Sequence, residues 1–163
     1  MSVTENFESF KEAVRSYGAK TLQSLLSAFL IWLFGVLVFI PISNSLGSEV
    51  KLLCTLIIFI AFTAVISQTF VKLKRLIDTF SIVPAQKYFI KRGWNTENGV
   101  EVSKQVFYSI FAIVLFLFYF PLLMNLHPAL SGIALILTIG FVLFSAIKAF
   151  GASMEAINHW LNS

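Results

Sequence analysis

The sequence predicts an all-α integral membrane protein with four transmembrane helices arranged as two helical hairpins, together with amphipathic interfacial helices. Composition is the first observation behind this prediction. Hydrophobic residues make up 58% of the 163 residues and charged residues 12%, against about 45–50% and about 25% in soluble domains. The second observation is a set of four long apolar stretches, each long enough to cross a hydrocarbon core about 30 Å thick. The mean hydropathy of +0.85 agrees with both.

The four apolar stretches cover residues 22–40, 50–71, 106–126 and 129–150. Their only charged residues are Lys51 and Lys148, and each lies near an edge. A charged side chain at the bilayer centre costs about 2.5–3.5 kcal/mol on insertion scales, so this placement favours membrane spans. The first stretch ends at Pro41, and residues 1–20 lack the pattern of a signal peptide. We therefore expect the first stretch to be retained as a membrane anchor.

Short polar turns are expected at residues 41–48 and around residues 125–128, so each pair of spans forms a tight hairpin. The hairpins are separated by a longer segment. The expected organisation is an interfacial helix at 1–20, a first hairpin at 21–72, a cytoplasmic loop with amphipathic segments at 73–104, a second hairpin at 105–150 and an amphipathic tail at 151–163.

Basic residues gather in the segments between and before the hairpins, and the short turns hold only Lys51 at their margin. By the positive-inside rule, the N-terminus, the C-terminus and the central loop are expected on the cytoplasmic side of a cell membrane. The net charge of +4 does not favour nucleic acid, because the basic residues lie beside apolar stretches and not on one folded face.

The cytoplasmic segments have the pattern of helices that lie at the membrane surface. Phe7, Phe10, Val14 and Tyr17 recur at helical spacing, and residues 73–92 combine apolar, aromatic and basic residues. Residues 93–99 are predicted to form an exposed turn. Interfacial contact with membrane lipids is expected at Lys74, Arg75, Lys91, Arg92 and Trp94.

Nothing in the sequence predicts catalysis, a metal site or a cofactor. The expected topology places His127 and His159 on opposite sides of the membrane, and common catalytic motifs are absent from the sequence. Cys54 lies within an apolar stretch and is expected to be a small packing residue. Polar groups inside the spans, such as Thr55, Thr63, Ser67 and Thr138, are expected mainly to bond backbone carbonyls. A small transporter is disfavoured because the spans hold no central charge.

The last span and the tail that follows it are rich in small residues, which allow helix backbones to approach closely in lipid. They are Gly132, Gly140, Ser145, Ala149, Ala152, Ser153 and Ala156. Two interpretations stay open. These residues either pack against other helices of the same chain, which is the favoured reading, or form a face for self-association around a pore.

The two hairpins resemble copies of one unit, because a shift of 80 residues places Pro41 on Pro121 and Leu46 on Leu126. The segment 128–140 (PALSGIALILTIG), followed by Lys148 and an amphipathic tail, resembles the conserved transmembrane-helix repeat of small-conductance mechanosensitive channel relatives and their accessory membrane proteins. Residues 102–126 resemble the hairpin before the pore helix of that family. A Gly/Ala-alternating pore helix of the usual kind is missing from the sequence, as is a β-rich vestibule domain.

The resemblance implies a minimal, self-assembling channel of mechanosensitive-like type, without enzymatic activity. The alternative is an accessory or structural subunit of a larger membrane protein complex, and a small transporter comes third. The expected partners are membrane lipids and either further copies of the chain or other subunits.

Overall fold

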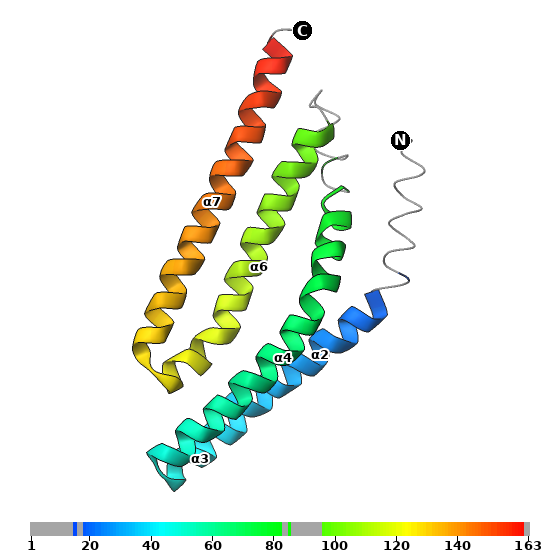
Figure 1. The fold of residues 1–163 in the computed structure, drawn as a ribbon. Helices are drawn as coiled ribbons and strands as arrows, with labels where there is room; N and C mark the ends of the chain where they lie inside the picture. The colour runs from blue at the N-terminus through cyan, green and yellow to red at the C-terminus, as the bar shows by residue number, and fades with distance from the viewer. Residues whose placement is uncertain (1–14, 16–17, 83–84, 86–95, 162–163) are drawn as a thin grey trace.

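The computed structural model describes residues 15, 18–82, 85 and 96–161, and in this part of the chain the regular elements are all helical. Four helices are long and apolar enough to span a membrane: Ala19–Leu46, Ser48–Phe70, Asn98–Leu126 and Pro128–Met154. The expected all-α membrane fold with four spans is therefore confirmed. Figure 1 shows both inter-helix turns at one end of the molecule, and the end of α7 together with the start of α6 at the other.

The first span consists of α2 (Ala19–Phe34), a π-helical segment η2 (Gly35–Phe39) and α3 (Ile40–Leu46). The expected polar turn at 41–48 is wrong, because the helix continues through Pro41 to Leu46. Proline has no N–H for the bond to the carbonyl four residues earlier, and its ring crowds that carbonyl. The wider π-helical turn just before Pro41, in which the Ile40 N–H donates to the Gly35 carbonyl, fits the proline into a continuous helix.

The actual turn of the first hairpin is Gly47, which separates α3 from α4 (Ser48–Phe80). Its φ of +125° is the one positive φ among the described residues. Only glycine adopts this region without steric cost, so a single residue can reverse the chain. The Lys51 N–H then donates to the Gly47 carbonyl at 3.0 Å, and the second helix begins at once.

The second hairpin pairs α6 (Thr96–Leu126) with α7 (Pro128–Leu161), joined by His127. The expected exposed turn at 93–99 is wrong for residues 96–99, which begin α6; residues 93–95 lie outside the described part. Pro128 is the first residue of α7, where its missing N–H costs nothing. Both hairpins turn at positions 80 residues apart, since α3 ends at Leu46 and α6 at Leu126. The predicted repeat matches these bounds.

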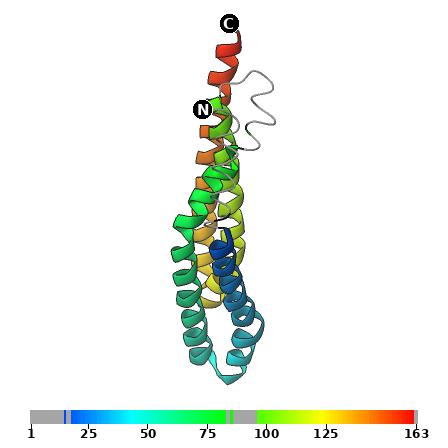
Figure 2. The same ribbon diagram turned by 90° about the vertical axis from the view of Figure 1, so that its right-hand side faces the viewer.

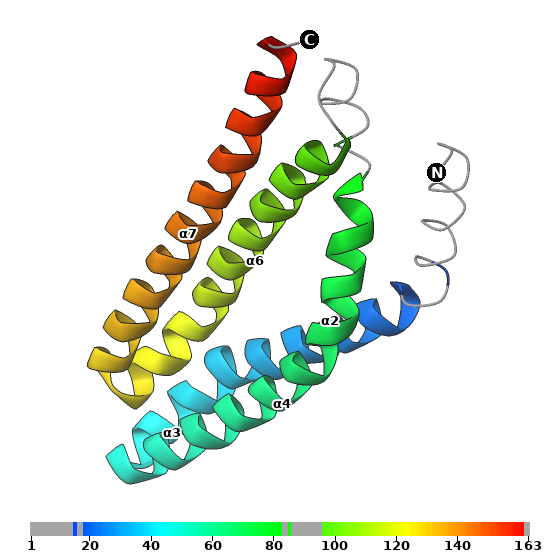
Figure 3. The same ribbon diagram turned by 45° about the horizontal axis from the view of Figure 1, so that its top comes forward.

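The helices form a layer in which α6 lies between α7 and α4 (Figure 1), and the molecule seen edge-on is much narrower (Figure 2). α4 bends, so that its first part pairs with the first span and its last part runs beside α6 (Figure 3). α4 contains neither proline nor glycine. The hydroxyls of Ser67 and Thr69 bond the carbonyls of Ala64 and Val65, and such back-bonding favours bending.

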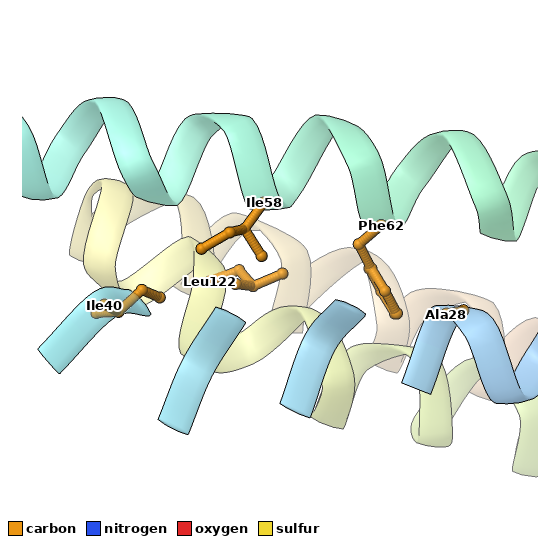
Figure 4. Close-up of a cluster of buried hydrophobic side chains, with 5 residues drawn as sticks. All are labelled: Ala28, Ile40, Ile58, Phe62 and Leu122. Carbon is orange, nitrogen blue, oxygen red and sulfur yellow. The ribbon is translucent and has the colours of Figure 1, made fainter. Parts of the chain in front are cut away.

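The core lies where α2, α3, α4 and α6 meet (Figure 4). It consists of Ala28, Ile40, Ile58, Phe62 and Leu122. Around it, the Trp32 Nε1–H donates to the Phe118 carbonyl at 2.7 Å, and the two rings meet edge to face at 5.0 Å. α7 contributes no residue to this core.

Candidate functional site

The outermost helix, α7, has α6 as its one extensive neighbour among the described helices. Along most of its length, the side of α7 that faces away from α6 is exposed and apolar; Ile136, Leu143 and Ile147 are examples. In lipid an apolar surface needs no cover, since the bilayer core is itself the solvent. The outer face of α7 is nevertheless uncovered by any other described helix, and a further helix would have room to pack there.

The predicted small residues divide between the two sides of α7. Ser145 is 1% exposed and lies against α6. Ala149 and Ser153 line a shallow groove with the α6 residues Gln105 and Ser109, and Ala152 is half-buried. Ala156 lies in α7, but its side chain is outside the described part. Ser145, Ala149 and Ser153 therefore lie on the side of α7 that faces α6.

The glycines of α7 lie on the other side. Gly132, Gly140 and also Gly151, which the sequence analysis did not single out, are exposed. A Cβ atom placed on any of them would meet nothing within 4 Å. No close approach inside this chain therefore requires these glycines, although each costs about 1 kcal/mol of helix stability relative to alanine.

The polar groups inside the spans are largely bonded within the protein. Thr55, Ser67, Thr69 and Thr138 donate to carbonyls three or four residues earlier in their own helices. Tyr119 donates instead across the helix interface to the Thr63 hydroxyl at 2.9 Å. Among the described residues, the buried side-chain polar atoms without a partner are the hydroxyl oxygens of Thr21 and Ser145.

A polar cluster joins the two hairpins at the end opposite the turns. Asp78 on α4 accepts a hydrogen bond from the Tyr108 hydroxyl at 3.0 Å, and the Lys104 ammonium lies 3.7 Å from the same carboxylate oxygen. The sequence analysis missed this cluster. The one feature of the sequence that could have indicated this cluster is Asp78, an isolated acidic residue that follows the basic residues Lys72 and Lys74.

We expect the bond between Asp78 and Tyr108 to contribute about 0.5–1 kcal/mol, because interhelical hydrogen bonds in membranes average about that much. A double-mutant cycle with Asp78→Asn and Tyr108→Phe, measured by unfolding in mixed detergent and dodecyl sulfate micelles, gives this coupling. Lys104→Gln should cost less, since an ion pair with both side chains about one-third exposed is worth little. Independent, additive effects of the two cycle substitutions would contradict the expected bond.

The residues expected to contact lipid headgroups are only partly within the described part. Lys74 is exposed on α4. Lys91, Arg92 and Trp94 lie outside the described residues, as does the side chain of Arg75. Lys148 on α7 lies over the Phe144 ring, with its ammonium 5.1 Å from the ring centroid. This position near the end of the span matches a cation that reaches toward the membrane surface.

His127 has a structural explanation in the turn. Its Nδ1 accepts a hydrogen bond from the Ala129 N–H at 3.2 Å, and its carbonyl accepts from Leu130. The side chain thus satisfies one of the unpaired N–H groups at the start of α7, as a helix cap does. The side chain of His159 is outside the described part, and the described residues hold no cluster of three metal-ligating side chains.

A continuous apolar groove runs along α6 between α4 and α7; we name it the α4/α7 groove. Its first part, of about 220 Å³, lies next to Lys74 and Tyr108, and its second part, of about 410 Å³, reaches Leu123. Ala112, Leu115 and Phe141 line both parts, which makes the groove continuous. It exists because α4 and α7 pack on different sides of α6 and leave a strip of α6 between them uncovered.

Comparison with known proteins assigns no family. No family model matches this sequence, and no curated protein or solved structure is significantly similar to it. The resemblance to relatives of mechanosensitive channels therefore stays a prediction. The fold shows that this chain is a helical, multi-pass membrane protein.

Proposed function

We propose that the protein is a non-enzymatic membrane subunit that assembles with further copies of itself through the outer face of α7, and that the assembly acts as a minimal channel of mechanosensitive-like type. The observation that carries this proposal is the position of α7. It lies outside the core, has one extensive neighbour, and turns its glycines Gly132, Gly140 and Gly151 away from the rest of the chain.

Glycines on this face favour association with a further helix because helices in lipid gain stability mainly from close van der Waals contact. Lipid chains do not require a glycine, whereas a neighbouring backbone does. All copies of a membrane protein have the same orientation in the bilayer, so a contact between two different faces repeats around an axis along the membrane normal. Such a contact closes into a ring when the rotation between copies allows it.

The part of the outer face of α7 that a neighbouring copy leaves uncovered would line the centre of such a ring, so its chemistry bears on conduction. Between Gly132 and Ile147 this face is apolar, and Lys148 follows at its end. A narrow pore lined by apolar side chains excludes water and is closed until it widens. Membrane tension favours a state with larger area in the membrane plane, and so would favour the wider ring.

We expect Gly140→Leu to weaken self-association at least tenfold, because a leucine side chain keeps two backbones apart, while a Cβ atom at this position meets nothing within 4 Å. Ser27→Leu, on an exposed position of α2, is the matched control and should leave association unchanged. The measurement is the mass of the particle in lipid nanodiscs, compared with 18.3 kDa for one chain.

Three outcomes would contradict the proposal. They are a wild-type particle that contains a single chain, a Gly140→Leu variant that assembles as well as the wild type, and the co-purification of unlike subunits, which would favour an accessory role. Where a ring forms, patch recording from reconstituted liposomes should show conductance that rises with suction. A ring that shows no conductance over the whole pressure range would contradict the proposed channel activity, although not the proposed self-assembly.

A further inference from the structure

The α4/α7 groove has apolar walls along its length and one cationic group at its mouth. Lys74 from α4 and Tyr108 from α6 line the part of the groove that lies farther along both helices from the turns at Gly47 and His127, and the remaining lining is predominantly aliphatic and aromatic. From Tyr108 to Leu123, α6 rises about 22 Å at 1.5 Å per residue. The groove therefore follows most of a hydrocarbon core about 30 Å thick.

The polar side chains inside the groove have partners in the protein. The Tyr108 hydroxyl donates to Asp78, the Tyr119 hydroxyl donates to Thr63, and the Thr138 hydroxyl donates to the Ala134 carbonyl. The groove thus offers no unsatisfied hydrogen-bonding group to a polar occupant. Hydrocarbon is the chemistry that its interior accepts without cost.

The mouth of the groove differs from its interior because it holds a charged group, the Lys74 ammonium. The carboxylate of Asp78 lies 3.7 Å from the Lys104 ammonium, so this acid has its own cation. Lys74 forms no ion pair with any residue in the described part of the chain. Among the described residues, Lys74 is therefore the one cation that lines the groove without an ion-pair partner, four residues beyond the end of the span at Phe70.

We propose that the α4/α7 groove is a binding site for one anionic phospholipid, with an acyl chain along α6 and the phosphate near the Lys74 ammonium. The Lys74 ammonium at the mouth and the apolar interior, in two parts of about 220 and 410 Å³, favour a lipid with a charged headgroup over a second transmembrane helix. This site does not depend on whether the chain assembles through the outer face of α7.

The test uses the purified full chain in a neutral detergent, titrated with phosphatidylglycerol or with phosphatidylcholine of the same acyl chains and followed by native mass spectrometry. We expect phosphatidylglycerol to bind about fivefold more tightly, which is the effect of about one basic residue at a membrane surface. Lys74→Gln should remove this preference. Lys72→Gln, a lysine on the same helix that does not line the groove, should retain it.

A phosphatidylglycerol with a photoreactive diazirine on its acyl chain locates the bound chain in the wild type and in both variants. Crosslinks at Ala112, Leu115 and Phe141 that decrease with Lys74→Gln and persist with Lys72→Gln are expected. The proposal is overturned by crosslinks spread over the outer face of α7 with equal yield in both variants. It is also overturned if Lys74→Gln and Lys72→Gln lose the preference for phosphatidylglycerol equally, because the preference would then come from the overall positive charge and not from Lys74.

Discussion

Phe62→Ala is expected to destabilise the folded chain by about 3 kcal/mol. The Phe62 side chain is 2% exposed and lies at the centre of the core shown in Figure 4. Its ring is 5.1 Å from the Tyr119 ring and 6.2 Å from the Phe118 ring, so it connects α4 to α6. The truncation leaves a cavity among helices that do not collapse fully. The value lies at the low end for phenylalanine because the lipid is as apolar as the core, so burial itself contributes little.

The measurement is the fraction of folded protein against the mole fraction of dodecyl sulfate in mixed micelles, followed by circular dichroism. Phe34→Ala is the control, because Phe34 is exposed on α2 and its loss opens no cavity. We expect the control to stay within about 0.5 kcal/mol of the wild type. Equal effects of the two substitutions would show that the core described for α2, α3, α4 and α6 does not hold the hairpins together.

Gly35→Ala is expected to destabilise the chain by about 2 kcal/mol, although alanine is the better helix former. A Cβ atom on Gly35 would overlap Cγ2 of Ile58 on the facing helix. This methyl group is attached directly to Cβ of a β-branched side chain, which has one preferred rotamer in a helix and cannot swing aside. The backbones of η2 and α4 would have to separate, and the loss of packing exceeds the gain of about 1 kcal/mol from helix propensity.

Gly151→Ala is the matched control for Gly35→Ala. A Cβ atom on Gly151 meets nothing within 4 Å, so we expect the stability of the single, unassembled chain to rise by up to about 1 kcal/mol. The double variant Gly35→Ala/Ile58→Ala should lose less unfolding free energy than the two single variants lose together, because removing the Ile58 branches relieves the overlap. Strict additivity would contradict the close contact between the first span and α4.

The sequence was sufficient to predict the four spans because charge placement is a property of the local sequence. Lys51 lies three residues from the start of its span and Lys148 six residues from the end of its span, in agreement with the cost of burying charge at the centre of lipid. The end of the first span was not predictable in the same way. The rule that a helix stops at proline holds for α-helical hydrogen bonding. The π-helical segment before Pro41 has a different hydrogen-bond pattern, so the helix continues through the proline.

The sequence alone could not predict which residues contact each other across helices. Trp32 and Phe118 are 86 positions apart, and nothing local to either residue shows that they form a hydrogen bond. The small residues of the last span illustrate the same limit. Their spacing predicts helix contact, but whether they face α6 or outward depends on how the hairpins pack. The structure places Ser145 against α6 and Gly140 on the outer side.

The two hairpins also differ in a way that their predicted similarity does not show. Both contain a proline six residues before the turn residue, Pro41 before Gly47 and Pro121 before His127, but only the first is preceded by a π-helical segment. α6 and α7 stay paired along their length, whereas α4 leaves the first span and runs beside α6 (Figure 3). A repeat in sequence is therefore compatible with two different packing environments, and the second hairpin keeps the free outer face.

Single-cysteine labelling in intact cells tests most directly the central claim that the chain crosses the membrane four times with both turns on one side. Cys54 is replaced by serine, and one cysteine is placed at Ser45, at His127 or at Asn158, all of which are exposed. A membrane-impermeant maleimide should label positions 45 and 127 from outside, and position 158 only after permeabilisation. Labelling of position 158 in intact cells, or opposite behaviour of positions 45 and 127, would contradict the four-span topology and its orientation.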